Sequence, residues 1–389
     1  MNLYEAHNQW ATRPADERFA TLEEMLKATK RYADVAVEQE TTPGDLQVAL
    51  TVDSDEPMLY VGTGGVPMRL TNWAFTQLSQ RAGAPADYLR SLPADMTVPL
   101  LNYGIMRRAV EMENKPVKLL VQSNGSRILR AITGTGYQRF WNWRVAAGLV
   151  QLRDVEGWRT PPARPATEGQ PGSRVATELD VLASSWVRAG DIIAPAGLYA
   201  SDHDMFAFMV NEEYSIIVPG TQTELSRGFF VEHSEVGDSA YKVWLFLYEK
   251  VCGNHIVWNA QNVREISIAH KGAALERIAD NLAKGLGEYA SSSAEADEAK
   301  LQRLSSVEIG RDKDAVIAAL FGKRLLSQTI ASRAYDACEQ EQTPIDGSNP
   351  RTPWGVAQGL TRISQLSQYA DQRSLLDRAA GKVLEAWSE

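Results

Sequence analysis

Apolar side chains recur at helical spacing in several stretches of the chain, and turn or capping residues bound most of these stretches. The clearest stretch begins after Thr71, a favourable N-cap, and ends at Gly83, the residue type that often follows a helix. Its apolar positions Phe75, Leu78 and Ala82 share one face. Similar patterns are present at residues 16–32, 85–91, 96–110, 315–338 and 354–387, and around residues 145–150. The C-terminal part of the chain is therefore predicted to be helical.

Apolar runs bounded by turn residues predict strands in two places. Residues 118–122 and 127–133 flank Asn124-Gly125, a dipeptide that favours a two-residue type I′ turn, and together they predict a β-hairpin. Between residues 180 and 260, turn residues separate four further apolar or aromatic runs, which predicts an antiparallel sheet. These runs are residues 205–210, 214–218, 225–233 and 240–251.

The predicted fold class is α+β, with a central antiparallel sheet flanked by helices and a helical C-terminal part. Three parts are expected: an acidic N-terminal segment at residues 1–60, an α+β core at 61–290 and a helical C-terminal region at 291–389. Within the first part, residues 38–56 contain turn chemistry and are expected to form loops. Residues 160–174 are rich in Pro and Gly and predict a surface loop inside the core.

Composition excludes several classes of protein. The chain of 389 residues is 44% hydrophobic and 23% charged, as soluble globular proteins are, and no apolar run is long enough to cross a membrane. Its two cysteines, Cys252 and Cys338, are too few for a disulfide scaffold or a CxxC-type zinc site. The first residues lack the basic and apolar regions of a secretory signal. We therefore expect a cytoplasmic protein that does not bind a membrane.

Charge is distributed unevenly along the chain, whose net charge is −9. Residues 1–60 hold twelve acids and five cations, whereas residues 101–150 hold eight Lys or Arg and two acids. The eight cations are interleaved with Tyr, Phe and Trp. Single-stranded nucleic acid is bound by such a combination, since cations contact phosphates and flat rings stack on bases. One face of the predicted strand at residues 240–251, which holds Lys242 and Trp244, offers a second stacking platform.

The predicted nucleic-acid-binding residues are Arg107, Arg108, Lys118, Arg127, Arg130, Tyr137, Arg139, Trp141, Arg144, Lys242 and Trp244. An ordinary core gives a similar pattern, because buried strands and helices carry aromatic residues beside solvated Lys and Arg, and the acidic net charge favours that interpretation. No catalytic residue, metal ligand or cofactor is predicted.

Two other functions remain open. His203, Asp204, His233 and Glu235 lie on or beside the predicted sheet, and they are the candidate ligands of a metal-dependent nuclease, although no HExxH or hydrolase motif is present. The second alternative is a non-enzymatic protein-interaction factor that acts on a host protein, which a large exposed apolar patch would favour. An enzyme is the less favoured of the classes.

Several segments resemble one protein family. They are residues 73–93, 127–142 and 228–258, and the last contains Ser234-Glu235-Val236-Gly237 and then Val251-Cys252-x-Asn254. These segments resemble the phage/plasmid-like protein family, a domain of unknown function numbered 932, whose members lie in phages, prophages and plasmids. The resemblance covers most of the chain from about residue 70. It implies a phage- or plasmid-encoded protein in the host cytoplasm, and it implies no activity because none is assigned to the family.

The charge pattern and the resemblance together lead us to expect a homo-oligomeric protein that binds single-stranded DNA in replication or recombination. By analogy with ring-forming single-strand annealing proteins, its expected action is strand annealing. Annealing needs no catalytic residue. It needs a surface that holds backbones by cations while bases remain exposed.

Overall fold

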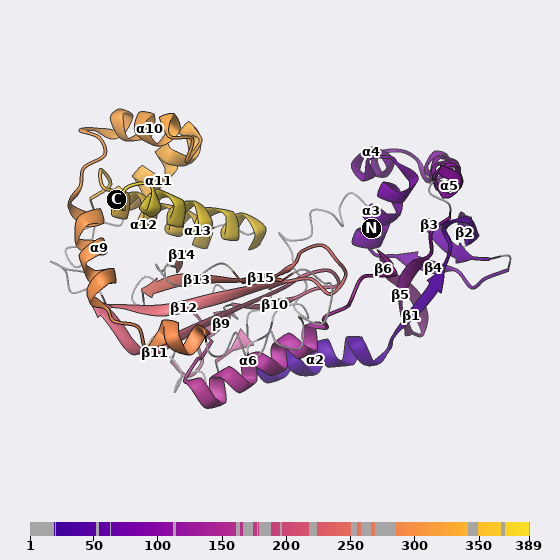
Figure 1. Ribbon diagram of the computed structural model, residues 1–389, viewed down its shortest axis with the longest axis horizontal. Coiled ribbons are helices and arrows are strands. Elements are labelled where there is room, and N and C mark those ends of the chain that lie inside the picture. Colours follow the sequence, from indigo (N-terminus) through magenta and orange to yellow (C-terminus); the bar gives the residue numbers. More distant parts are fainter. Residues whose placement is uncertain are drawn as a thin grey trace.

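Two large β-sheets and the helices around them organise the chain, which confirms the predicted α+β class (Figure 1). The computed structural model describes residues 19, 21–51, 54–62, 64–111, 114–160, 164–165, 174–176, 178, 188–194, 197–217, 224–249, 255–257, 266–268, 285–340, 349–366 and 370–388. The sequence observations on Cys252 and Asn254 lie outside these residues. Within the described ranges, no helix combines the length and the apolar character needed to cross a membrane.

The first sheet, named here the central sheet, is antiparallel as predicted. Its strands, in spatial order, are β10 (Leu198–Ala200), β11 (Met205–Ile217), β12 (Glu224–His233), β13 (Tyr241–Glu249) and β14 (His255–Val257), and β15 (Ile266–Ile268) also pairs with β13. The runs predicted at residues 205–210 and 214–218 are one strand, β11. The pairing register shifts between Asn211 and Ser215, so an irregularity interrupts the apolar pattern without ending the strand.

The second sheet, named here the N-terminal sheet, extends well beyond the predicted hairpin. Its spatial order is β1 (Ala36–Thr41), β5 (Val117–Asn124), β6 (Ser126–Gly134), β4 (Met68–Leu70), β3 (Ser54–Val61) and β2 (Leu46–Thr51). The β4–β6 pair is parallel and the other pairs are antiparallel. The expectation of loops at residues 38–56 is wrong. In the described part of this range, Pro43–Asp45 form the short 3-10 helix η3, while Leu46 and Val48 are buried on one face of β2.

A third, small sheet joins β7 (Arg164–Pro165), β9 (Ile192–Ala194) and β8 (Arg174–Val175). The segment predicted as a surface loop at residues 160–174 therefore contains β7 and the first residue of β8.

The predicted hairpin is formed by β5 and β6, but its turn is tighter than expected. Asn124 is the last residue of β5 and pairs with Ser126, so Gly125 lies between the two strands with a φ of +76°. Glycine adopts this conformation readily because it has no Cβ. The hairpin is confirmed, whereas the two-residue type I′ turn at Asn124-Gly125 is wrong.

Helices α3 (Asn72–Ala82), α4 (Ala86–Ser91) and α5 (Ala94–Glu111) pack against the N-terminal sheet (Figure 1). Thr71 caps α3 by accepting a hydrogen bond from the backbone N of Ala74 at 3.1 Å, and Gly83 ends it with a φ of +74°, as predicted. The core between these helices and the sheet includes Phe75, Leu78, Leu101, Ile105, Leu119 and Leu129.

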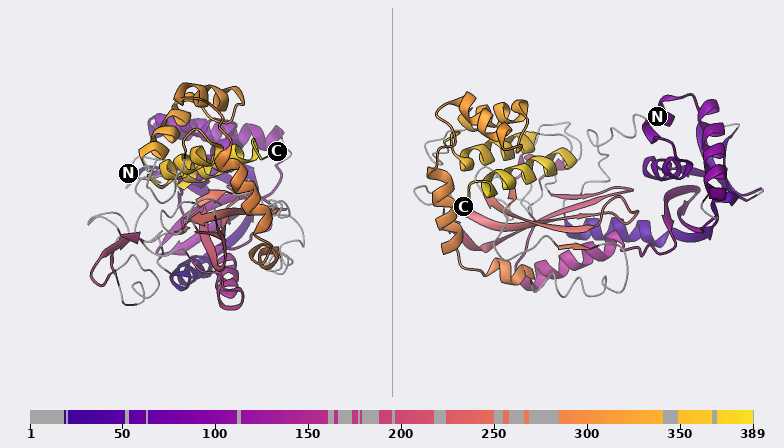
Figure 2. Two further views of the ribbon diagram at one scale, coloured as in Figure 1. Left: turned by 90° about the vertical axis from the view of Figure 1, so that its left-hand side faces the viewer. Right: turned by 45° about the horizontal axis from the view of Figure 1, so that its top comes forward.

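Helices lie on both sides of the central sheet (Figures 1 and 2). α2 (Leu22–Asp34) and α6 (Asn142–Glu156) lie side by side along one face, where their buried residues Met25 and Leu149 share a core with Met209, Phe229 and Val243. The C-terminal helices lie on the other side or at the end of the sheet. They are α9 (Glu295–Ser306), α10 (Lys313–Gly322), α11 (Gln328–Gln340), α12 (Pro353–Leu366) and α13 (Ala370–Glu385).

The helical C-terminal region is confirmed, but two of its helices are divided. The helix predicted at residues 315–338 is α10 and α11, and the one predicted at 354–387 is α12 and α13. Arg324, between α10 and α11, has a φ of +58°, which a right-handed helix does not allow. Since the apolar pattern continues through this break, periodicity alone does not reveal it.

A buried arginine links the C-terminal region to the central sheet through hydrogen bonds and an ion pair. Arg227 of β12 donates hydrogen bonds to the backbone oxygens of Ala290 and Ser292 at 3.1 and 2.9 Å. Its Nη2 also lies 2.8 Å from Asp297 Oδ2, in the first turn of α9. One side chain therefore neutralises a charge and satisfies the carbonyl groups just before the helix.

Candidate nucleic-acid interface

Residues 234–237, named here the junction turn, follow β12 and connect the central sheet to the N-terminal sheet and α3. The backbone O of Val236 accepts hydrogen bonds from Trp73 Nε1 at 3.2 Å and Gln77 Nε2 at 3.0 Å. Gln77 Oε1 in turn accepts from the backbone N of Ile132 in β6 at 2.7 Å. Gly237 has a φ of +89°, a conformation that glycine adopts readily because it has no Cβ. These contacts give the junction turn a structural role.

Arg130, a predicted phosphate contact, is buried beneath the junction turn. Arg130 and Glu235 have side chains that are each 2% exposed, and Arg130 Nη2 lies 2.8 Å from Glu235 Oε1. The same nitrogen donates to the backbone O of Asp202 at 2.9 Å. Glu235 Oε2 accepts from the backbone N of Asn142 at 2.8 Å, so the carboxylate also stabilises the N-terminus of α6. The assignment of Arg130 to a binding surface is wrong, because its guanidinium is buried and forms an ion pair with Glu235 inside the protein.

Arg139 and Tyr137 also point into the protein. Arg139 Nε lies 2.8 Å from Glu38 Oε1, and its side chain is 2% exposed. The guanidinium carbon lies 5.4 Å from the centre of the Tyr137 ring and 5.6 Å from that of Trp141. The Tyr137 hydroxyl donates to the backbone O of Ser234 at 3.3 Å, and burial raises the pKa of this hydroxyl. The prediction of Arg139 as a phosphate contact is therefore wrong as well, since the group forms an internal cation–π stack.

Four other candidates lie on α5 and the N-terminal sheet, and each contacts a neighbour. Lys118 Nζ lies 4.0 Å from Glu40, and Arg107 Nε lies 3.5 Å from Glu111. The remaining two contacts are those of Arg127 Nη2 with Gln39 Oε1 and Arg108 Nη1 with the backbone O of Gln80, both at 3.4 Å. These side chains stay at least partly exposed, and a role for them in binding stays a prediction.

The second stacking platform, on β13, is mostly covered. Phe246 is fully buried, so it offers no surface to a base. Trp244 stacks on Phe230 with 6.1 Å between ring centres, and Arg378 of α13 lies 5.1 Å from the Trp244 ring. Lys242 Nζ lies 3.2 Å from Glu232. The alternation predicted for this strand is confirmed, but its aromatic face is packed against other parts of the protein.

The candidate interface is therefore the surface where the C-terminal half of α2 meets the N-terminus of α6. We name it the α2–α6 surface and define it by Lys27, Lys30, Arg31, Trp143 and Arg144. Lys30 Nζ and the Arg144 guanidinium each lie 5.6 Å from the centre of the Trp143 ring. All four cations are exposed and Trp143 is half-buried.

Acidic partners are few on the α2–α6 surface. Lys30 forms an ion pair with Asp34, one helical turn away. Among the described residues, no carboxylate lies within 4 Å of the charged groups of Lys27, Arg31 or Arg144. The sequence prediction missed the three cations of α2 because residues 1–60 are acidic as a block. The segment LKATKRY inside the predicted helix could have identified these cations, because three Lys or Arg lie within five residues there.

The four candidate metal ligands do not form one set, although His203 and Asp204 are neighbours. Glu235 is paired with Arg130, and His233 Nε2 donates to the backbone O of Phe140 at 2.8 Å. No group of three or more His, Cys, Asp or Glu side chains suited to a metal ion is present in the described part of the chain. The arrangement therefore gives no support to the metal-dependent nuclease.

His203 forms a local charge cluster instead of a metal site. Its Nδ1 lies 2.8 Å from Asp202 Oδ1, and its Nε2 lies 3.6 Å from Asp204 Oδ2. Burial opposes protonation of the imidazole, but the attraction of Asp204, Asp202 and Asp238 outweighs it and raises the pKa of His203 to about 9. His203 is therefore a cation at neutral pH.

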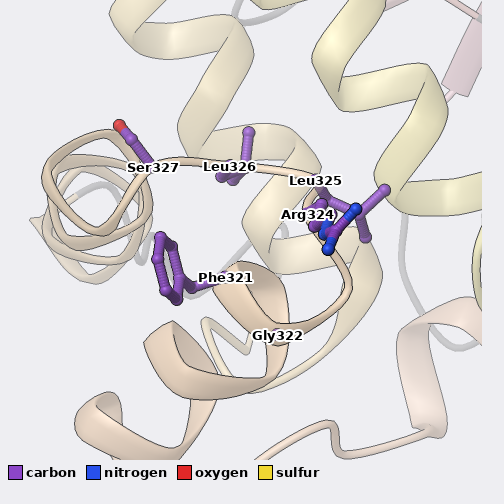
Figure 3. Close-up of a pocket in the computed structure, with 6 residues that line it drawn as sticks. All are labelled: Phe321, Gly322, Arg324, Leu325, Leu326 and Ser327. Carbon is purple, nitrogen blue, oxygen red and sulfur yellow. The ribbon is translucent and has the colours of Figure 1, made fainter.

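A pocket of about 470 Å³ lies at the turn between α10 and α11 (Figure 3). It is lined by Phe321, Gly322, Arg324, Leu325, Leu326 and Ser327. Its single charged lining group is Arg324, and no acid–base pair is present among these six residues. The pocket lies in the C-terminal helical region, away from the α2–α6 surface (Figure 1).

Comparison with known proteins gives a family and no named relative. A family model described as "Domain of unknown function (DUF932)" matches residues 172–368. No curated protein and no solved structure matches the chain.

Proposed function

The chain belongs to the DUF932 family, and because the family description assigns no activity, we propose a function from the chain's own surface. The protein binds single-stranded DNA at the α2–α6 surface. The phage or plasmid setting, and a role in replication or recombination, belong to this proposal and follow from the family resemblance.

The observation that carries the proposal is the charge of the α2–α6 surface. Lys27, Lys30, Arg31 and Arg144 lie on two adjacent helices, and Asp34 is the carboxylate paired among them. Cations without carboxylate partners keep their full attraction for phosphates, and their counterions are released when DNA binds. The net charge of −9 does not oppose this, since the local field depends on nearby charges more than on the total.

Trp143 supplies the second requirement of a single-strand site, which is a flat ring at the surface. The ring lies between the cations Lys30 and Arg144 at 5.6 Å from each. A base that stacks on Trp143 displaces one of these cations toward the neighbouring phosphate. Stacking on an aromatic ring tolerates any base, so the expected binding is independent of sequence.

The same geometry is compatible with strand annealing. The cations project from the outer surface of two helices, so a bound backbone leaves its bases accessible to a second strand. Annealing requires no catalytic group, and we include it in the proposal as the action that follows binding.

The test is the salt dependence of binding to a labelled single-stranded DNA, measured by fluorescence anisotropy. Lys27→Ala, Arg31→Ala and Arg144→Ala are combined in one variant. We expect its affinity to fall and the slope of log K against log salt to decrease by about 0.7 for each phosphate that the variant no longer neutralises. Trp143→Ala is expected to weaken binding by about 1–3 kcal/mol with little change in that slope.

The matched control replaces three exposed cations of the C-terminal region, Arg311, Lys323 and Arg324, by Ala. This variant has the same net charge as the α2–α6 variant, so it separates local contacts from overall charge. We expect it to bind as the wild type does. Wild-type protein that does not bind at low salt, or an equal decrease in affinity in both triple variants, would refute the proposed site.

A further inference from the structure

The outer face of α5 is apolar although it is exposed. Met96, Leu100, Tyr103, Met106 and Val110 have exposed fractions of 56, 45, 69, 51 and 80%. The opposite face of the helix already packs against the N-terminal sheet. An exposed apolar stripe on a helix that is otherwise well packed is typical of an interaction surface. We name these five residues the α5 stripe.

The members of the α5 stripe lie along one face of the helix. They follow one another at intervals of four, three, three and four residues, and side chains three or four residues apart are neighbours on a helix surface. Such spacing favours another helix as the occupant of the surface, since its side chains insert between those of α5.

The stripe is also symmetrical about Tyr103. Met96 and Val110 lie seven residues to either side of it, and Leu100 and Met106 lie three residues to either side. An interface between two identical copies on a two-fold axis must be self-complementary. An antiparallel pair of α5 helices centred on Tyr103 meets this condition, because each apolar residue faces an apolar residue of the other copy.

Charges at the ends of α5 favour the antiparallel arrangement. Asp95 lies in the first turn, whereas Arg107, Arg108 and Glu111 lie in the last two turns and give that end a net positive charge. Antiparallel pairing about Tyr103 places Asp95 of one copy opposite Glu111 of the other and about one turn from Arg107 and Arg108. The two ends that meet then have opposite net charges, whereas parallel pairing places ends of like charge side by side. Tyr, Met and Arg are also the residue types enriched in protein interfaces.

We propose that two copies of this chain associate through antiparallel pairing of their α5 helices about Tyr103. A stable interface buries roughly 800 Å² on each partner, which is more than five partly exposed side chains supply. Tyr88 of α4, which is 58% exposed, is a further apolar group among the helices that pack on the N-terminal sheet. The expected dimer is therefore reversible and depends on protein concentration.

The first test is the molar mass in solution over a range of concentrations, measured by sedimentation equilibrium. Wild-type protein is expected to shift from monomer to dimer, and Tyr103→Glu is expected to remain monomeric because it places two carboxylates at the axis. Val155→Glu is the control, since Val155 is 72% exposed on α6, outside the stripe. A wild type that is monomeric throughout, or a dimer that Tyr103→Glu leaves intact, overturns the proposal.

The second test distinguishes the antiparallel pair from other dimers by disulfide formation under oxidation. A disulfide requires Cα atoms within about 7 Å, so Tyr103→Cys is expected to cross-link to itself. Met96→Cys alone and Val110→Cys alone are expected not to cross-link, because fourteen residues separate each from its own copy by about 21 Å along the helix. A mixture of these two variants is expected to give the covalent dimer.

Wild-type protein, which retains Cys252 and Cys338, controls for cross-links through native cysteines. Self-cross-linking of both Met96→Cys and Val110→Cys, or absence of a cross-link in Tyr103→Cys, overturns the antiparallel arrangement. Since all three substitutions are at exposed positions, a normal circular dichroism spectrum is expected for each variant.

Discussion

At the scale of single residues, a cation's partner decides what the cation does, and partners distant in sequence are not predictable from composition. Arg130 and Arg139 were counted as surface charge, yet their partners Glu235 and Glu38 come from segments about one hundred residues away. Arg144 has no such partner among the described residues and remains a candidate contact. The sequence therefore identified the correct chemistry around residues 137–144 and could not separate its buried cations from its exposed one.

His203 gives a prediction of pH dependence at this scale. Its pKa is raised to about 9 in the folded protein, from about 6.5 in an unfolded chain. The folded state therefore holds its proton more tightly, so this stabilisation is complete below pH 6.5 and is lost as pH rises through 9. Each unit of pKa difference corresponds to about 1.4 kcal/mol.

Urea unfolding between pH 6 and pH 10 measures this effect. Wild-type protein is expected to lose unfolding free energy across that interval, and His203→Gln is expected to lose much less. Equal slopes for the two proteins would show that the Asp202 and Asp204 contacts do not hold the imidazole charged.

At the scale of helices and strands, elements that are determined by neighbouring residues were predicted correctly, whereas a strand that depends on a distant partner was not. Thr71 and Gly83 bound α3 because capping is decided within one turn, and β5 and β6 pair across a single glycine. β1 and β2 were missed for different reasons. β2 pairs with the adjacent β3 but lies in a range whose turn residues indicated loops, whereas β1 is short and has a partner distant in the sequence. β1 pairs with β5, whose sequence lies about eighty residues later. Its alternation is too brief to distinguish it from a loop.

The β5–β6 turn gives a prediction at this scale. Gly125 has a φ of +76°, and a Cβ added there meets nothing within 4 Å, so the cost of Gly125→Val comes from backbone strain alone. We expect a loss of stability of about 1–2 kcal/mol.

Gly148→Ala in α6 is the comparison. A Cβ added at Gly148 also meets nothing within 4 Å, but this residue has a helical conformation, so the substitution is expected to stabilise the protein by about 0.5–1 kcal/mol. Thermal unfolding of both variants provides the comparison, and a neutral Gly125→Val would contradict it.

At the scale of the whole molecule, the segment matched by the family model is smaller than the folding unit. Residues 172–368 contain the central sheet, but α2 and α6, which cover one of its faces, lie before residue 172. Arg227 joins the sheet to α9 within the match, whereas the Arg130–Glu235 pair crosses its boundary.

The corresponding prediction is that residues 172–389 expressed alone do not reach the native state. Phe229 and Met209, now fully buried, lose their cover, and Glu235 loses the cation that neutralises it. We expect aggregation, or a spectrum without fixed tertiary packing in near-ultraviolet circular dichroism. Addition of residues 1–171 is expected to restore a soluble complex. A fragment that is monomeric and unfolds cooperatively by itself would contradict this prediction.

The Arg130–Glu235 pair has a consequence for how such a chain can change by recombination. A hybrid gene that kept Glu235 but received an apolar residue at position 130 would encode a buried carboxylate without a counter-charge. Breaking a buried pair in this way costs about 3–5 kcal/mol, a large share of the roughly 5–15 kcal/mol that holds a typical domain folded. The segments that contain Arg130 and Glu235 must therefore be inherited together. A hybrid protein is expected to fold when it has both charged residues or neither of them.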